Sequence, residues 1–264
     1  MLDGLPNLYA DFLNDDPTEG NGRQWGVGAF HLQRLPRTPP PGMLYAGTGW
    51  WDFDFRSCHA SILHSLARAY GLETPWLDAY LSDREQINEE ISEDIAVPVW
   101  KMKRVMNSTL YGQPLSKTPR SSLLKTLGSS AAVDKLTLHL YYRMLRDELN
   151  QVIRPVVIAK HSNGKEIINV VGKVRTLEEE NTLHPGTFKK VPPRKLLSHI
   201  LTGYEAWALN VVCSNQTDLI ALMHDGWVSE QRRDTVALEA AIQKQSKGAF
   251  GFPLELMIKS QQFQ

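Results

Sequence analysis

WWDFDFRSCHASILHSLARAY, residues 50–70, is the stretch that decides the fold. In its first half aromatic residues alternate with Asp52 and Asp54, which is the period of two expected of a β-strand with one buried face. In its second half the apolar residues from Ile62 to Ala69 follow the spacing of a helix. The stretch therefore predicts a strand that leads into a helix, with Asp54 at the end of the strand.

The rest of the chain is predicted to be mostly helical, with a few short strands. Residues 1–48 are rich in Gly and Pro, which favours loop with short strands. The patterns predict two helices between 76 and 96, helices over 98–111, 131–152, 194–215 and 233–247, a loop over 115–130, strands over 155–177 around an Asn163-Gly164 turn, a hairpin over 219–230 and a strand over 253–260. This order predicts an α+β fold, an antiparallel sheet backed by helices.

The neutral total charge, 29 basic against 29 acidic residues, conceals an uneven distribution. Residues 73–94 hold eight acidic side chains and only Arg84 as a cation, whereas residues 101–146 hold nine basic side chains and only Asp134 as an anion. A basic channel with an acidic outer wall would give this distribution, and such a channel would bind a polyanion. Two solvated helix faces of opposite sign would give the same pattern.

Length and composition favour one compact domain with subdomains, since 42% of the 264 residues are hydrophobic. The first residues lack the pattern of a signal peptide, and no stretch approaches the ~18 apolar residues of a membrane span. We therefore expect a cytoplasmic protein with no membrane partner. The only cysteines, Cys58 and Cys213, lie far apart, so neither a disulfide framework nor a zinc knuckle is expected.

Histidine and cysteine chemistry is not expected from the spacing. No zinc spacing links the histidines His59, His64, His199 and His224. Cys58 and His59 are neighbours, and neighbours on a strand point to opposite faces, so we do not expect them to share a site.

Two aspartates stand where a sheet would present them together. Asp54 lies at the end of the predicted central strand, and Asp225 lies at the tip of the predicted hairpin. Phosphoryl transfer with metal assistance needs two carboxylates that bridge divalent ions ~3.5–4 Å apart, and Mg²⁺ prefers such oxygen ligands. Either aspartate alone is more often an ordinary strand-end or turn residue than a catalytic one, so the interpretation depends on the sequences around them.

Three motifs resemble those of the family A polymerases. DFRSCHASIL (54–63) resembles motif A, MHDGWVS (223–229) resembles motif C, and KRVMNSTLYG (103–112) resembles the fingers helix that ends in Tyr-Gly, which the single-subunit phage RNA polymerases share. Gly22-Arg23, followed by the LQ and Pro of residues 32–36, resembles the family's GR and LQ element, and residues 194–203 resemble its template-tracking helix. All five elements follow the family order and together cover nearly the whole chain from about residue 19.

The resemblance implies a polymerase palm with reduced helical fingers and a role for residues of each motif. The catalytic set would be Asp54, Asp225, Lys103 and Tyr111, and two Mg²⁺ ions, with Mn²⁺ as a substitute, would be held at Asp54, Asp225 and Phe55. The nucleotide would be bound by His59, which takes the position beside the sugar 2′ carbon, and by Lys101, Arg104, Asn107, Gly112 and Arg84. The nucleic acid would be bound by Arg23, Gln33, Arg194, Ser198, Thr202 and His224.

Several positions depart from the family pattern. Gly226 replaces the acidic residue that follows His-Asp, Thr202 replaces a Gln before the helix glycine, and His59 replaces the motif A Glu. Val99 stands where an arginine is expected one turn before Lys103. None of these changes removes a metal ligand, so they bear on substrate choice more than on catalysis.

The resemblance divides the chain into an N-terminal segment (1–48), motif A (49–72), reduced fingers (73–155) and the remaining palm (156–264). A thumb and an exonuclease domain are not expected, so a second subunit would supply the thumb or processivity. We expect synthesis on a DNA template and primer from nucleoside triphosphates, in phage, plasmid or mobile-element replication. An RNA polymerase or primase of the same fold, a catalytically silent nucleic-acid-binding subunit and a nuclease that uses the same carboxylates are the alternatives.

Overall fold

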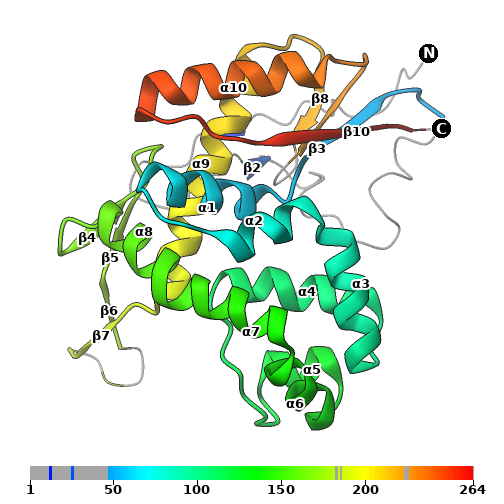
Figure 1. Ribbon diagram of the computed structural model, residues 1–264. Coiled ribbons are helices and arrows are strands. Elements are labelled where there is room, and N and C mark those ends of the chain that lie inside the picture. The colour runs from blue at the N-terminus through cyan, green and yellow to red at the C-terminus, as the bar shows by residue number, and fades with distance from the viewer. Residues whose placement is uncertain are drawn as a thin grey trace. The chain divides into compact units, whose positions relative to one another are not determined.

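The computed structural model describes residues 12–13, 25–26, 47–181, 184, 186–222 and 226–263 (Figure 1). The chain forms two compact units, which we call the sheet unit (1–65, 168–174 and 201–264) and the helical unit (66–167 and 175–200). Two helices contribute residues to both units: α1 (Cys58–Ala69) and α9 (Pro193–Ser214). None of the helices in the described ranges is both long and apolar enough to cross a membrane.

The sheet unit is built on four antiparallel strands in the order β10-β3-β9-β8. The bounds are Trp51–Arg56 for β3, Leu219–Leu222 for β8, Gly226–Ser229 for β9 and Met257–Gln262 for β10. The register sets Asp54 opposite Gly226 on one side and opposite Lys259 on the other. Helix α10 (Thr235–Phe250) contacts β10, beside which it runs in Figure 1. The predicted α+β fold, an antiparallel sheet backed by helices, is confirmed.

The core of the sheet unit is aromatic. Phe53 and Phe55 point from the same face of β3, and both are almost fully buried. Trp227 of β9 stacks on Phe53 with ring centroids 5.2 Å apart and meets Phe55 edge-on at 5.6 Å. Because these rings fill one face of the strand, the two aspartates between them must lie on the other. Two short strands, β1 (Phe12–Leu13) and β2 (Trp25–Gly26), pair separately.

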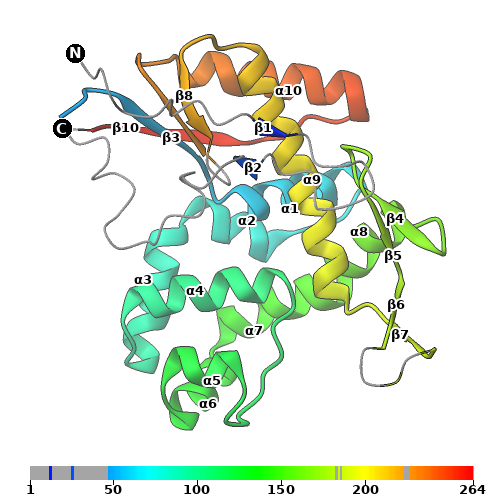
Figure 2. The same ribbon diagram turned by 180° about the vertical axis from the view of Figure 1, so that it is seen from behind.

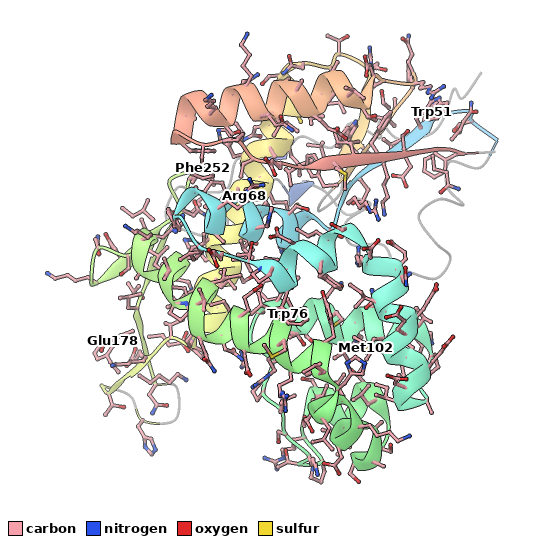
Figure 3. The ribbon with its side chains drawn as sticks, in the orientation of Figure 1. Trp51, Arg68, Trp76, Met102, Glu178 and Phe252 are labelled. Atoms are coloured by element: carbon pink, nitrogen blue, oxygen red, sulfur yellow. The ribbon has the colours of Figure 1, made fainter. Side chains whose placement is uncertain are left out.

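The helical unit is a group of short helices (Figure 2). They are α2 (Pro75–Ser82), α3 (Arg84–Ile95), α4 (Val99–Leu110), α5 (Ser122–Leu127), α6 (Ser130–Leu138), α7 (Leu140–Asp147), the π-helix η3 (Glu148–Ile153) and α8 (Arg154–His161). Met102 of α4, labelled in Figure 3, is fully buried. The buried carboxylate of Glu148 accepts the Trp76 and Leu77 amides at the start of α2, where the helix dipole favours an anion.

Short strand pairs lie along the second half of the chain. β6 (Glu178–Glu180) and β7 (Phe188–Lys190) form an antiparallel pair, with Glu178 labelled in Figure 3. β4 (Glu166–Ile168) and β5 (Val174–Thr176) form another. Their connection runs over 169–173 rather than through the expected Asn163-Gly164 turn, which is closed instead by an isolated bridge between Ser162 and Ile167.

Three predicted elements were wrong. The helix expected over 131–152 is broken at His139, whose extended backbone ends α6 and whose side chain caps α7. Residues 155–161, expected as a strand, belong to α8, which begins next to Pro155. The loop expected over 115–130 contains α5, capped by Ser121. A short apolar run does not by itself distinguish a strand from a buried helical turn, and this ambiguity explains the second error.

Candidate functional site

The polar face of β3 carries two carboxylates. Asp52 and Asp54 are two residues apart on a strand and therefore point the same way, opposite to the aromatic core. The Asp54 side chain is 28% exposed, and its Oδ2 lies 2.6 Å from Nζ of Lys259 on the adjacent strand β10. This face of the sheet is acidic, and it holds a cation.

The pKa of Asp52 is raised to about 6, first by burial and second by the negative charge of Asp54, while Lys259 opposes both effects. A shift in this direction means that two ionised carboxylates side by side on this face are unfavourable. The face would therefore be stabilised by more positive charge than Lys259 alone supplies.

Gly226 explains why the expected acidic residue after Asp225 is missing. A Cβ atom at Gly226 would lie 2.3 Å from the carbonyl oxygen of Phe53, closer than any side chain tolerates. Strands β3 and β9 approach so closely here that only glycine fits. Asp225 and His224 themselves lie outside the described residues, and β9 begins at the residue that follows Asp225.

Phe55 has a limited part in any metal site. Its side chain is buried on the aromatic face beside Trp227, away from Asp54. Of its atoms, only the main-chain carbonyl oxygen is a hard ligand of the kind that Mg²⁺ prefers.

The turn between β3 and α1 brings together residues that we did not expect to meet. Ser57 has a positive φ of 52°, and α1 begins directly after it at Cys58, so Cys58 and His59 lie in a helical turn and not on the strand. Nε2 of His59 and Oε2 of Glu205 on α9 form a hydrogen bond, 2.5 Å long. The donor atoms of Cys58, His59 and Glu205 all lie within 4.8 Å of one another. The expectation that Cys58 and His59 would not share a site was wrong, because it assumed that the strand continued through them.

Helix α4 presents a basic, polar face. Lys103, Asn107 and Tyr111 follow one another at intervals of four residues and so lie along one stripe of the helix, while the opposite side of α4 is buried. Arg104 is exposed, and Nζ of Lys101 lies 3.5 Å from the Leu127 carbonyl oxygen. The helix starts after Pro98 and ends at Tyr111, as predicted.

A cavity of about 1160 Å³ opens beside the end of this helix, within the helical unit. Its lining combines apolar residues with cations: Tyr111, Gly112, Arg154, Lys165, Phe188, Lys190 and Arg194 are among them. Phe188 is 68% exposed. The cavity thus brings together three residues that the sequence proposed separately, namely Tyr111, Gly112 and Arg194.

Arg154 supports the floor of this cavity. Its side chain is 5% exposed, and its Nε donates to the Leu149 carbonyl oxygen at 3.1 Å. The pKa of Arg154 is lowered to about 10, first by burial and second by the positive charge of the nearby Arg146. Gly112, with φ +86°, leaves room for the guanidinium, since a Cβ atom there would lie 2.0 Å from Nη1.

The remaining predicted residues have mixed surroundings. Arg194 is exposed and Ser198 half-buried, but Thr202 is 2% exposed and does not reach the surface. Arg84 begins α3 and hydrogen-bonds Tyr80, where burial raises the tyrosine pKa and this bond opposes the shift. Arg23 and Gln33 lie outside the described residues.

No protein-family model and no curated protein matches this chain. Among solved structures, it is similar to the POL domain of Pol1 from M. smegmatis, described in complex with DNA primer-template and dNTP. The TM-score is 0.57 and the sequence identity 17%, over 91% of this chain. The fold is that of a polymerase domain. This chain covers 45% of the length of that structure's chain.

Sequence reasoning missed four charged residues of these sites: Asp52, Arg154, Glu205 and Lys259. Only Asp52 had a signal, the alternation of WDFDF. Glu205 and Lys259 reach the β3–α1 segment from α9 and β10, more than 140 residues away in the chain, and no local pattern predicts such a pairing.

Proposed function

We propose that this chain is a template-directed nucleotidyltransferase, a DNA-directed DNA polymerase of the family A type. The observation that carries the proposal is the position of Asp54 in a polymerase-domain fold. It lies on the polar face of the central strand, directly opposite the first residue after Asp225. The resemblance assigns the second catalytic carboxylate to Asp225, the residue that precedes β9 in the chain.

The residues around Asp54 suit a divalent cation. The carboxylate is accessible, a cation already contacts it, and the adjacent Asp52 carboxyl adds negative potential. Mg²⁺ or Mn²⁺ ions held by Asp54, Asp225 and the carbonyl of Phe55 would activate the attacking 3′-hydroxyl and neutralise the leaving pyrophosphate. Lys259 would have to leave Asp54 for such an ion to bind.

In the helical unit, α4 would bind the incoming nucleotide. Lys103 and Arg104 form no ion pair among the described residues, so their charge is available to the triphosphate. Tyr111, half-buried at the end of the helix, would lie beside the base, with Asn107 between it and Lys103. Lys101 and Arg84 would add to the positive field. His59 would crowd a 2′-hydroxyl, which favours deoxynucleotides.

The basic cavity beside Tyr111 would take part of the nucleic acid. Arg194, Lys165 and Lys190 supply charge for phosphates, and the exposed ring of Phe188 offers a face on which a base can stack. Ser198 on the same helix as Arg194 would continue this contact. Arg23, Gln33 and His224 are proposed for the primer-template on the resemblance alone. A second subunit is proposed to add the thumb.

The test is extension of a labelled primer on a DNA template with Mg²⁺, with dNTPs and with NTPs in parallel lanes. We expect dNTP-dependent extension that Asp54→Asn and Asp225→Asn each reduce by about a thousandfold, equivalent to ~4 kcal/mol of lost transition-state stabilisation. The matched control is Asp78→Asn, an equally isosteric change at an exposed position of α2, which should retain full activity.

Each alternative predicts its own result. Extension with NTPs, or products without primer, would identify an RNA polymerase or primase. Degradation of the oligonucleotide without triphosphates would identify a nuclease. Saturable binding of primer-template without any Asp54-dependent reaction would identify a silent binding subunit and overturn the enzymatic proposal.

A further inference from the structure

The side chains of Cys58, His59 and Glu205 form a cluster of three different donor types. Cys58 and His59 come from the first turn of α1, and Glu205 comes from the part of α9 that belongs to the sheet unit. Sulfur, nitrogen and oxygen donors all lie within 4.8 Å of one another. We propose that these three residues bind a single Zn²⁺ ion. This proposal does not depend on the polymerase proposal.

The three side chains lie where a dication could balance the charge of their ionised forms. Glu205 is 1% exposed and Cys58 is 5% exposed, while the His59 side chain is 16% exposed. An ionised carboxylate removed from water is stable only with a cation or several hydrogen bonds. A thiolate, a carboxylate and a neutral imidazole together carry two negative charges, which a dication balances.

The donor set selects the metal. Thiolate and imidazole ligands suit Zn²⁺, whereas Mg²⁺ and Ca²⁺ take oxygen ligands. With bonds of about 2.0–2.3 Å, tetrahedral ligands stand roughly 3.3–3.7 Å apart. Donor atoms that lie within 4.8 Å of one another would have to approach by at most about 1 Å, and the His59–Glu205 contact would have to open by a similar amount, which are rotamer-scale adjustments. Three protein ligands leave the fourth position for water or another small ligand.

The local fold holds the ligands in place before any ion binds. The left-handed turn at Ser57 ends β3 and directs Cys58 and His59 into the same helical turn. Glu205 lies between the buried residues Tyr204 and Ala206. A bound ion would link the start of α1 to α9 and fix the orientation of the His59 ring.

The test uses Co²⁺ as a spectroscopic probe with the full chain after metal removal by a chelator. We expect one equivalent of Co²⁺ to bind, with the visible bands of tetrahedral cobalt and a thiolate-to-cobalt charge-transfer band. Cys58→Ser should abolish the charge-transfer band, whereas Cys213→Ser, which changes the other cysteine, should retain it. Excess Mg²⁺ should displace none of the cobalt, and Zn²⁺ should displace all of it.

Glu205→Gln should weaken Zn²⁺ binding by more than the roughly 10–100-fold typical of a residue that only supports a ligand. Circular dichroism of each variant in chelator establishes that it is folded. The proposal is overturned if wild-type protein binds no stoichiometric Co²⁺, or if its cobalt spectrum lacks the thiolate band. Primer extension by protein that binds no Zn²⁺, or Zn²⁺ binding by protein that extends no primer, separates this proposal from the polymerase proposal.

Discussion

Gly226→Ala tests the register on which the acidic site depends. The substituted Cβ would lie 2.3 Å from the Phe53 carbonyl oxygen, and side chains essentially never approach closer than 3.0 Å. The neighbour is main chain, so the contact is not relieved by a rotamer change. Strands β3 and β9 would have to separate by the difference, 0.7 Å, at the position where Asp54 faces Gly226.

The cost follows from that separation. Overpacking in a rigid interior costs about 1–3 kcal/mol, and each weakened ladder hydrogen bond adds up to about 1 kcal/mol. We therefore expect Gly226→Ala to lower the free energy of unfolding by about 3 kcal/mol. Gly248→Ala is the matched control, because Gly248 lies in α10 with no atom within 4 Å of its added Cβ. It should stabilise the protein by up to about 1 kcal/mol through helix propensity.

The measurement is urea unfolding of both variants and the wild type, followed by circular dichroism. The midpoints should fall on opposite sides of the wild-type value. If Gly226→Ala unfolds at the wild-type midpoint, β9 does not lie against β3 in this register, and the placement of Asp54 beside the residue after Asp225 fails with it.

Three further predictions concern single residues. Asp52 has a folded-state pKa raised to about 6. The resulting penalty to stability is absent below about pH 4, grows between about pH 4 and 6, and is constant above that. Asp52→Asn should therefore stabilise the protein by about 1 kcal/mol at pH 7, after allowance for solvent screening, and by nothing at pH 3.5, as measured by urea midpoints. Burial lowers the pKa of His161, and its hydrogen bond with the Val157 carbonyl only partly opposes this shift. The stability that this neutral histidine contributes above pH 6.5 is therefore lost as the pH falls. His161→Gln should make the melting temperature fall less steeply with decreasing pH in thermal melts. Gly112→Ala should destabilise more than Gly164→Ala, by about 1–2 kcal/mol, because both glycines have positive φ but only the first would collide with Arg154; equal losses would mean that Arg154 does not pack there.

Much of the fold was predictable because its signals are local. The alternation of WDFDF predicts a strand over 50–55, within one residue of β3 at each end, and the pattern over 219–230 located the β8–β9 hairpin. Pro98 marked the start of α4, so Lys103 and Tyr111 were correctly placed two turns apart on a helix. These features depend on residues a few positions apart, which is the range over which periodicity and capping act.

The rest depends on contacts that no local pattern encodes. The break at His139 depends on backbone dihedrals that helical periodicity does not report. The pairing of Lys259 with Asp54 follows from the register of a strand at the far end of the chain, and that of Glu205 with His59 follows from the packing of α9. The resemblance predicted that His59 binds the nucleotide, which stays a prediction, and its contact with Glu205 became apparent only in three dimensions.

The β3–α1 segment therefore offers two different kinds of ligand within a few residues. Asp54 and its neighbour Asp52 present hard oxygen atoms on the polar face of the strand, where Lys259 already occupies the place of a cation. Four residues beyond Asp54, Cys58 begins a cluster of sulfur, nitrogen and oxygen donors that is largely buried. Because Mg²⁺ avoids thiolate and Zn²⁺ favours it, the two sites would select different metals by ligand type alone. Zinc added in excess would also reach Asp54, so inhibition of primer extension by surplus zinc should persist in Cys58→Ser.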